Sequence, residues 1–253
     1  MKLRNHSLSL VFAVLMVCLA GCEIQPTSRE GASGVNPLEE ALRAPASIAR
    51  QEGIAAAILM DVSGSMEDTV KDSKGMSMPK IEIARRAVVT LLGQFDDFAK
   101  KDPNRPVLVG VYEFSARDRQ PSCRQVIPLG KPDLANSVAE VSKMVPDGGT
   151  PIGDAMIKAK RDLDATGMSR RHILVVTDGE NNRGYSPGAV ANAIARQPEQ
   201  DRASIYFVAF NVAADVFNDV KEAGGLVLAA NSETDLRQTL DFILTGKILV
   251  ERP

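Results

Sequence analysis

The stretch "IAAAILMDVSGS", residues 54–65, decides the fold of this 253-residue chain. Its apolar part, Ile54–Val62, is interrupted only by Asp61 and is typical of a strand that is buried on both faces of a sheet. Ser63 and Ser65 follow at alternating positions. Side chains that alternate along an extended turn can converge on one point. The stretch therefore predicts a buried strand with a carboxylate and two hydroxyls at its end.

The rest of the chain alternates between apolar runs and segments with a helical period of apolar residues. We expect further strands at residues 107–114, 124–129, 172–177, 204–210 and 226–230, and Pro128 suits an edge strand. We expect a short helix from Asn36 and longer helices at residues 80–101, 133–144, 152–165, 186–196, 216–223 and 234–249. Strands that alternate with helices form a parallel sheet covered on both faces. The predicted fold class is therefore α/β, a doubly wound, mostly parallel six-stranded sheet.

Two further segments carry polar residues at turns that follow predicted strands or precede predicted helices. Asp178 follows the strand at 172–177, as Asp61 follows the first strand. Thr150 lies in Gly148-Gly149-Thr150-Pro151, which also has the composition of a helix start. Ligands of such sheets bind outside the carboxyl ends of the strands. The sequence therefore places two carboxylates at the edge of the sheet where this fold has its sites.

The three segments in this order resemble the von Willebrand factor A-type (VWA) domain of bacterial proteins. Lys80, Ala84 and Arg85 fit the helix opening of the same family, and the resemblance covers about Gly53 to Leu249. It implies a metal-ion-dependent adhesion site (MIDAS) with hydroxyls touching the metal and carboxylates acting mostly through water. It implies Mg²⁺ as the cofactor, with Mn²⁺ or Ca²⁺ as alternatives. The metal ligands that the resemblance implies are Asp61, Ser63, Ser65, Thr150 and Asp178.

The chemistry of these side chains agrees with the resemblance. Mg²⁺ prefers hard oxygen ligands in near-octahedral geometry. Three of the five side chains are neutral hydroxyls, which leave the charge of a bound cation poorly neutralised. Such a cation attracts an acidic side chain into its open position. We therefore expect a protein-binding module, and not an enzyme, that captures a protein partner through the metal and an acidic residue of that partner.

Two alternative functions stay open. A metal-dependent hydrolase, such as a phosphatase of the haloacid dehalogenase type, also places an Asp after its first strand. It needs a second Asp two residues later, where this chain has Ser63. A structural lipoprotein could use the metal only to stabilise its fold, but structure alone does not require an open coordination position. Phosphatase activity would favour the first alternative, and partner binding in chelator would favour the second.

The first residues have the layout of a secretory signal peptide, with Lys2 and Arg4 before an apolar run. The run ends in Leu19-Ala20-Gly21-Cys22, which resembles the lipobox of bacterial lipoproteins. The resemblance implies a signal peptide at 1–21, a lipidated Cys22 with a spacer and short helix up to residue 52, and a VWA domain at 53–253. The lipid would anchor the protein in the membrane of the bacterial cell envelope. Glu23 favours the outer membrane where the cell has two membranes, and otherwise the outer face of the cell membrane is expected.

The composition disfavours several classes of partner. The chain has 30 Lys and Arg against 32 Asp and Glu, so it lacks the basic excess of nucleic-acid-binding proteins. It has no Trp, and we expect no small-molecule substrate. After loss of the signal peptide and lipidation of Cys22, only Cys123 remains, so we expect no intramolecular disulfide and a structural thiol. His172 is then the single histidine, and we interpret it as a structural or surface residue.

Two polar segments lie near the predicted site. Residues 67–79, which include Asp68, Asp72 and Lys74, are interpreted as a long loop. Such a loop is either a lid or specificity element or a mobile surface loop. Glu180, Asn181 and Asn182 follow Asp178 and are interpreted as a solvated loop on the rim of the site.

Overall fold

A computed structural model describes residues 36–43 and 48–250. The predicted signal peptide, Cys22 and most of the predicted spacer lie outside the described residues. Within the two described ranges, no helix is long and apolar enough to cross a membrane. These residues form one compact unit.

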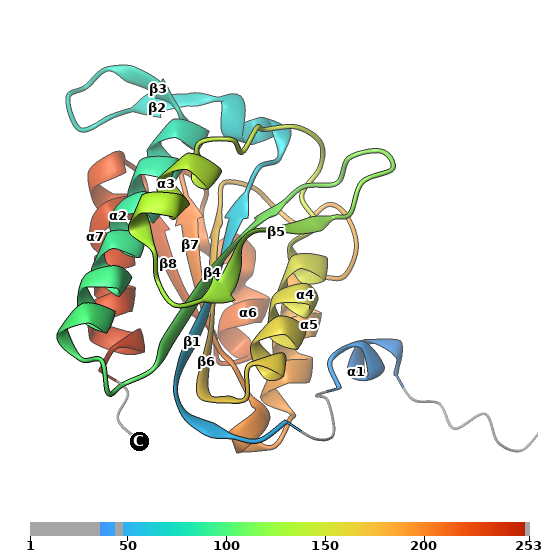
Figure 1. Cartoon of the computed structure of the whole chain (residues 1–253). Helices are drawn as coiled ribbons and strands as arrows, with labels where there is room; N and C mark the ends of the chain where they lie inside the picture. Colours follow the sequence, from blue (N-terminus) through green and yellow to red (C-terminus); the bar gives the residue numbers. More distant parts are fainter. Residues whose placement is uncertain (1–35, 44–47, 251–253) are drawn as a thin grey trace, which may run out of the picture. The chain divides into compact units, whose positions relative to one another are not determined.

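The centre of this unit is a six-stranded sheet in the order β5-β4-β1-β6-β7-β8 (Figure 1). All neighbouring strands are parallel except β5, which runs antiparallel to β4 at one edge and contains Pro128. The predicted α/β fold class is confirmed. The strands of this sheet are β1 (Gln51–Asp61), β4 (Val107–Phe114), β5 (Cys123–Gly130), β6 (Met168–Thr177), β7 (Ser204–Phe210) and β8 (Leu226–Ala230).

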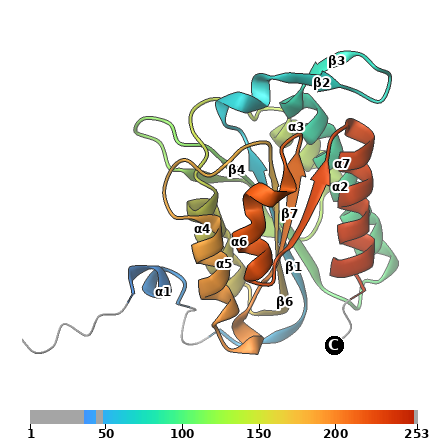
Figure 2. The ribbon, with the colours of Figure 1, turned by 180° about the vertical axis from the view of Figure 1, so that it is seen from behind.

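Helices cover both faces of the sheet (Figures 1 and 2). The helices α2, α3 and α7 bury their apolar residues against one face, and α1, α4, α5 and α6 bury theirs against the other. The helices are α1 (Pro37–Ala41), α2 (Lys80–Lys101), α3 (Leu134–Val141), α4 (Ile152–Ala165), α5 (Pro187–Ala195), α6 (Asn218–Glu222) and α7 (Glu233–Ile243).

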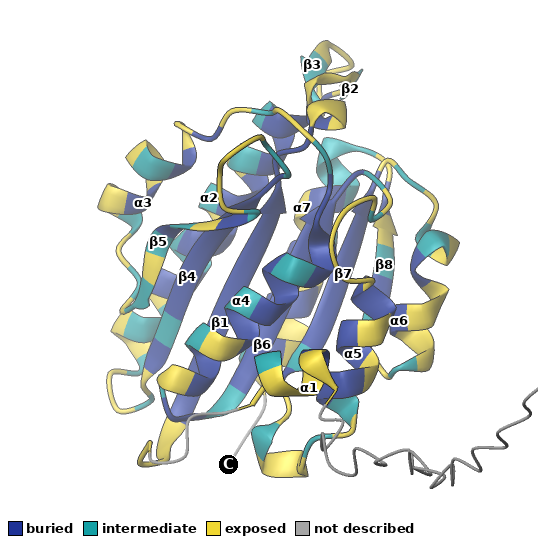
Figure 3. Cartoon of the chain, turned by 90° about the vertical axis from the view of Figure 1, so that its right-hand side faces the viewer, coloured by how far each residue is buried: buried dark blue, intermediate teal, exposed yellow. Residues whose placement is uncertain are grey.

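Strand β1 supplies both halves of the core (Figure 3). Ile54, Ile58 and Met60 belong to the apolar cluster under α2 and α7, while Ala57 and Leu59 belong to the cluster under α4 and α5. All five residues are fully buried. Because successive side chains of a strand point to opposite faces, an unbroken apolar run is what a strand between two helical layers requires.

The connections of β1 and β6 create a crevice at the carboxyl edge of the sheet. The chain leaves β1 toward α2 on one face and leaves β6 toward α5 on the other face. β1 and β6 are adjacent parallel strands, paired from Gln51 with Met168 to Met60 with Val176. Loops that leave neighbouring strands toward opposite faces open the space where ligands of this fold class bind. The fold thus singles out the ends of β1 and β6.

The interpretation of residues 67–79 as a long loop is wrong for much of its length. A 3₁₀ turn at Gly64–Glu67 leads into an antiparallel hairpin of β2 (Thr69–Lys71) and β3 (Ser77–Pro79). The hairpin turn is held by Asp72, whose Oδ1 accepts hydrogen bonds from the backbone N–H groups of residues 74 and 76 at 2.9 and 2.8 Å. Such side-chain bonding to the backbone stabilises a turn without any apolar alternation in the flanking strands. The hairpin projects beyond the carboxyl edge of the sheet (Figure 3).

Several predicted bounds are also corrected. β6 begins at Met168 and not at residue 172, because Arg170 and Arg171 near its start break the apolar pattern, although Arg171 is buried through its pairing with Asp164. The closing helix ends at Ile243 and continues as a π turn, and α6 is shortened to Asn218–Glu222 by a 3₁₀ turn before it. Leu38 and Leu42 are buried in the core, so the folded unit begins before residue 53.

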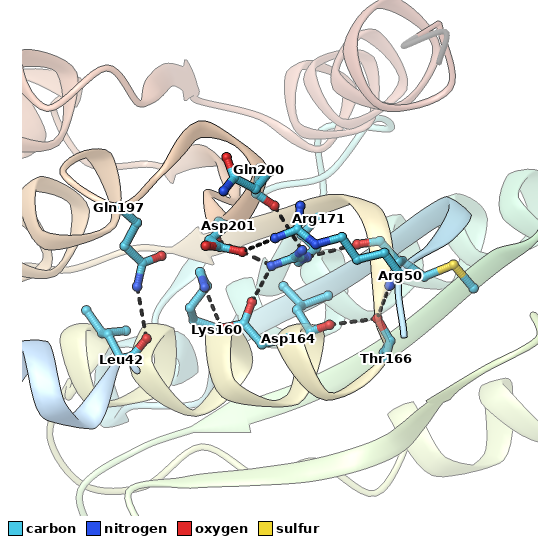
Figure 4. Close-up of polar contacts among 11 residues, drawn as sticks. Leu42, Arg50, Lys160, Asp164, Thr166, Arg171, Gln197, Gln200 and Asp201 are labelled. Carbon is cyan, nitrogen blue, oxygen red and sulfur yellow. Dashed lines mark hydrogen bonds and ion pairs between the residues drawn. The ribbon is translucent and has the colours of Figure 1, made fainter. Parts of the chain in front are cut away.

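A buried ionic network lies near the amino ends of the strands (Figure 4). We call Lys160, Asp164 and Arg171 the floor cluster. Asp164 accepts hydrogen bonds from Lys160 Nζ through Oδ2 and from Arg171 Nη1 through Oδ1, the latter at 2.6 Å. Arg171 also donates to the carbonyls of Met168 at 2.9 Å and Gln200 at 3.1 Å. The cluster ties α4, β6 and the segment before β7 together.

Candidate functional site

Three turns bring the five predicted site residues to the carboxyl edge of the sheet. Asp61 is the last residue of β1, and Asp178 directly follows β6. Ser63 directly precedes the 3₁₀ turn after β1, and Ser65 lies within that turn. Thr150 lies two residues before α4. We call residues 61–65 the serine turn and residues 148–151 the threonine turn. The Gly64 N–H donates to the Gly148 carbonyl at 3.0 Å, which fastens these two turns together.

Asp61 organises the serine turn from beneath. It is fully buried, and its Oδ1 accepts a hydrogen bond from the Ser63 backbone N–H at 2.7 Å. Its Oδ2 accepts one from Thr177 Oγ1 at 2.6 Å. Burial removes the carboxylate from water and raises the pKa of Asp61 to about 6, against the opposing effect of these hydrogen bonds. The charge of Asp61 is therefore costly to hold in the absence of a cation.

Asp178 joins a hydroxyl and an ammonium group. Ser65 Oγ donates to Asp178 Oδ1 at 2.8 Å and lies 3.2 Å from Ser63 Oγ. Lys80 Nζ, from the first turn of α2, donates to Asp178 Oδ2 at 2.7 Å and lies 3.7 Å from Asp68 Oδ2. Lys80 is itself buried. The ammonium group thus offsets one of the two carboxylate charges of the site.

The Thr150 hydroxyl is open toward the same space. Its backbone is held by Asn182, which accepts from the Thr150 N–H at 2.9 Å and donates to the Thr150 carbonyl at 3.1 Å. Within the described part of the chain, Thr150 Oγ1 has no hydrogen-bond partner. A Cβ placed on Gly179 would lie 3.7 Å from Ser65 Oγ and 3.9 Å from Thr150 Oγ1. Both hydroxyls therefore lie within contact distance of the position that a side chain at Gly179 would occupy.

Sequence reasoning missed three contributors to this arrangement. Thr177 bonds Asp61, Lys80 pairs with Asp178, and Asn182 holds the threonine turn. Residues 180–182 form a loop in which Glu180 and Asn182 are exposed, as predicted, but Asn181 and Asn182 also accept hydrogen bonds from the backbone of α4 and of the threonine turn. Thr177, a hydroxyl residue directly before Asp178, is the one contributor that the local sequence could have indicated. The contacts of Lys80 and Asn182 join residues far apart in sequence.

The donor set of the site consists of hydroxyls and carboxylates. No group of three or more His, Cys, Asp or Glu suited to a metal ion occurs among residues 36–43 and 48–250. A cation at this site would depend on hydroxyl oxygens, which suit Mg²⁺, Mn²⁺ or Ca²⁺ and not Zn²⁺. His172 is fully buried in β6 and takes no part in the site. Cys123 is buried in β5, and burial raises the pKa of its thiol to about 12, so the prediction of a structural thiol is confirmed.

Solved structures with the same fold include a minor pilin and a pilus adhesin. The PilB minor pilin from Streptococcus sanguinis is 15% identical with a TM-score of 0.60, over 82% of this chain and 65% of that one. The pilus adhesin SpaC from Lactobacillus rhamnosus GG is 15% identical with a TM-score of 0.60, over 79% and 31%. A von Willebrand factor type A protein from Catenulispora acidiphila is 18% identical with a TM-score of 0.56, over 75% and 41%. The chain spans less than two thirds of each.

The family comparison agrees with the fold. A comparison with curated proteins finds no match. The family of the von Willebrand factor type A domain matches residues 57–238, which include all five predicted site residues and all the strands of the sheet except the first residues of β1. The chain therefore belongs to the von Willebrand factor type A domain family.

Proposed function

We propose that this chain is a metal-dependent protein-binding module that is anchored by a lipid on Cys22 in the bacterial cell envelope. The observation that carries the proposal is that the hydroxyls of Ser65 and Thr150, from two separate turns, both lie within 4 Å of one point beside Gly179. Ser65 follows the end of β1 and Thr150 precedes α4, and both lie beside the buried carboxylates of Asp61 and Asp178. Hydroxyl and carboxylate oxygens are the kind of ligand that Mg²⁺ prefers.

The residues fit a divalent cation of the Mg²⁺ type, with Mn²⁺ or Ca²⁺ as alternatives. Ser63, Ser65 and Thr150 would hold the metal through their hydroxyls. Both oxygens of Asp61 and of Asp178 already accept hydrogen bonds from the protein. These carboxylates would therefore supply negative charge and orient the hydroxyls. The bound cation would act as an electrophilic contact point for an anionic ligand.

Charge explains why a partner would supply an acidic side chain. Lys80 offsets the charge of Asp178, so the buried carboxylates, Asp61 and Asp178, do not neutralise a divalent cation. Coulomb attraction inside a buried site is stronger than in water, so the remaining positive charge draws a carboxylate into the open position. This argument favours capture of a protein over catalysis. The described histidine, His172, is buried away from the site and offers no general base there.

The comparisons support a surface role. A minor pilin and a pilus adhesin share the fold, and both are proteins of the bacterial surface by their descriptions. A lipid on Cys22 would place this chain in the envelope, in the outer membrane where the cell has two. Adhesive capture of another protein is the function that the family, the donor set and the expected anchor favour together.

The test compares metal binding and partner capture by the full chain. Mg²⁺ affinity is measured by calorimetry, and envelope proteins are captured in Mg²⁺ and in chelator, for the wild type and for Asp61→Ala. Asp97→Ala, on the exposed face of α2, is the matched control. We expect metal binding and a metal-dependent partner in the wild type and in the control, and neither in Asp61→Ala with its fold intact.

Other outcomes would overturn the proposal. The same partners in Mg²⁺, in chelator and with Asp61→Ala would place the binding surface outside the metal site. Hydrolysis of a phosphate ester that is lost in Asp61→Ala would favour the metal-dependent hydrolase. Full partner capture in chelator by a protein that the metal merely stabilises would favour the structural lipoprotein.

A further inference from the structure

A second polar site lies at the amino edge of the sheet, at the opposite ends of the strands from the proposed metal site. A cavity of about 880 Å³ opens there around the first residues of β6, β7 and β8. Four cationic side chains line it, with Glu199 as the one acidic residue among the lining residues. The four are Arg170, Arg171, Arg202 and Lys247.

Arg170 is the residue that makes this cavity unusual. Its side chain is 11% exposed, and its Nε and Nη1 are buried without a hydrogen-bond partner. Within residues 36–43 and 48–250 it is the one arginine with two such nitrogens. Its Nη2 lies 3.7 Å from Glu52 Oε2, which is beyond hydrogen-bond distance. Glu52, which is 69% exposed, is therefore a distant ion-pair partner, and two buried donors of Arg170 have no hydrogen bond. Because buried donors without an acceptor cost free energy, a guanidinium group in this state favours a ligand.

The neighbouring Arg171 shows what a satisfied arginine looks like in the same fold. As the next residue in β6, Arg171 points to the face of the sheet opposite to Arg170. It is hydrogen-bonded to Asp164 and to the carbonyls of Met168 and Gln200 (Figure 4). Its charge is neutralised by Asp164 within the floor cluster. The binding capacity of the cavity therefore rests on Arg170.

Two exposed cations extend the positive charge around Arg170. Arg202 donates to the Gln197 carbonyl, and Lys247 lies 5.8 Å from the centre of the Phe242 ring. Neither has an ion-pair partner in the part of the chain that the structure describes. Gly224 and Gly225 form another part of the wall, and a Cβ on Gly224 would meet nothing within 4 Å. The cavity thus combines a buried guanidinium group, two exposed cations and an open rim.

We infer that this cavity binds a phosphate group, with Arg170 as its main ligand. A guanidinium fork bonds two oxygens of one phosphate at once, and Arg is the side chain best suited to such recognition. A phosphate monoester carries more charge than a carboxylate, and Arg202 and Lys247 supply the further cations that this charge requires. The volume admits a phosphate with an attached organic group. The inference does not depend on the proposed metal site.

The phosphate could belong to a soluble ester or to the headgroup of an anionic phospholipid. β1 starts at Gln51 and pairs there with Met168, so the chain enters the sheet at the same edge as the cavity. A lipid headgroup would therefore bind at the edge of the sheet where the chain enters β1. A soluble ester could bind whichever way the domain is oriented. The experiment below distinguishes a soluble ester from a lipid headgroup.

The test measures binding to the full chain by calorimetry at constant ionic strength. The probes are inorganic phosphate, glycerol 3-phosphate and dihexanoyl phosphatidylglycerol below its micelle concentration. We expect saturable binding that Arg170→Gln weakens about tenfold or more, as for loss of a charged hydrogen bond. The matched control Lys143→Gln removes an exposed cation on the turn after α3 and should leave the affinity unchanged. Tighter binding of the phosphodiester would indicate a lipid headgroup, and tighter binding of the monoester a soluble ligand.

The inference fails if none of the three probes binds saturably, or if folded Arg170→Gln binds as tightly as the wild type. A double variant, Arg202→Gln with Lys247→Gln, alters exposed residues and so keeps the fold. If Arg170→Gln does not fold, this double variant decides, with a several-fold weaker affinity expected. An unchanged affinity in the double variant would then overturn the inference.

Discussion

Two buried polar clusters lie at opposite ends of one sheet, and they differ in how far the protein satisfies them. In the floor cluster, both oxygens of Asp164 accept from cations, and Arg171 uses carbonyls for its remaining donors. At the carboxyl edge, Ser65 shares its hydrogen bonds with Asp178 and Ser63, and Thr150 Oγ1 has no partner within the described residues. The first cluster is complete as a part of the fold, and the second is not.

This difference teaches how to separate structure from function among buried charges. A buried charge is tolerated when it is paired and hydrogen-bonded, and such a pair needs no ligand. A buried donor or acceptor that lacks a partner costs free energy unless something outside the chain supplies one. By this criterion Arg170 indicates a ligand, whereas Lys160 and Arg171 indicate packing.

The largest expected effect is on the floor cluster. Asp164→Asn keeps the volume of the side chain but leaves Lys160 and Arg171 buried without a counter-charge. We expect a loss of about 3–5 kcal/mol in the free energy of unfolding, as for a broken buried ion pair. Urea denaturation at neutral pH measures it.

The control for Asp164→Asn is an exposed pair. Lys143 and Glu140 form an ion pair whose side chains are 65% and 44% exposed. Glu140→Gln should change the free energy of unfolding by less than about 1 kcal/mol. Equal losses in the two variants would contradict the view that the floor cluster stabilises the fold by burial and pairing.

A second prediction concerns acid stability at the same end of the sheet. Burial, and then the charge of Arg170, lowers the pKa of His172 to about 3, from 6.5 in the unfolded chain. The stability linked to His172 is therefore present above pH 6.5 and is lost as the pH falls toward 3. Between pH 6.5 and pH 4 the wild type should lose about 3 kcal/mol through this residue.

His172→Gln tests this prediction because glutamine does not titrate. Its free energy of unfolding should fall less steeply than that of the wild type over the same pH range. The carboxyl groups common to the two proteins contribute equally and cancel in the difference. Parallel profiles would mean that His172 becomes protonated in the folded protein as easily as in the unfolded chain.

The smallest effect on stability is expected at Gly179. A Cβ there would make ordinary contacts with Ser65 Oγ and Thr150 Oγ1, at 3.7 and 3.9 Å. Gly179→Ala should therefore change the free energy of unfolding by less than about 1 kcal/mol. It should nevertheless weaken Mg²⁺ binding, because the methyl group would lie within 4 Å of both hydroxyls that we propose as ligands. Calorimetry and denaturation of the same preparation measure the two effects.

Gly153→Ala is the contrasting variant near the same turn. A Cβ there would lie 2.0 Å from the Tyr185 carbonyl oxygen, so the backbone must shift. We expect a large loss of stability in this variant. If Gly179→Ala instead lost stability and kept its full metal affinity, the space over Gly179 would belong to the fold and not to a ligand.

The sequence predicted features that depend on local pattern. The apolar run of β1, the alternation of strands with helices and the position of Asp61 at a strand end were all readable. The hairpin at residues 69–79 was not, because one carboxylate holds its turn and its strands lack apolar alternation. The roles of Lys80 and Asn182 also escaped, since their partners lie 98 and 32 residues away in the sequence. The metal itself stays a prediction.

The site and the start of β1 occupy opposite ends of the same strand, and this has a mechanical consequence. β1 pairs in parallel with β4 from Ile54 to Asp61 and with β6 from Gln51 to Met60. Tension between the chain ahead of Gln51 and a ligand held beyond Asp61 would run along the strand. This tension would load the hydrogen bonds of β1 to β4 and to β6 in shear, so that they would resist it together and would not break one after another. The loaded strand is the innermost part of the sheet, so pulling on a captured partner would strain the most resistant element of the fold.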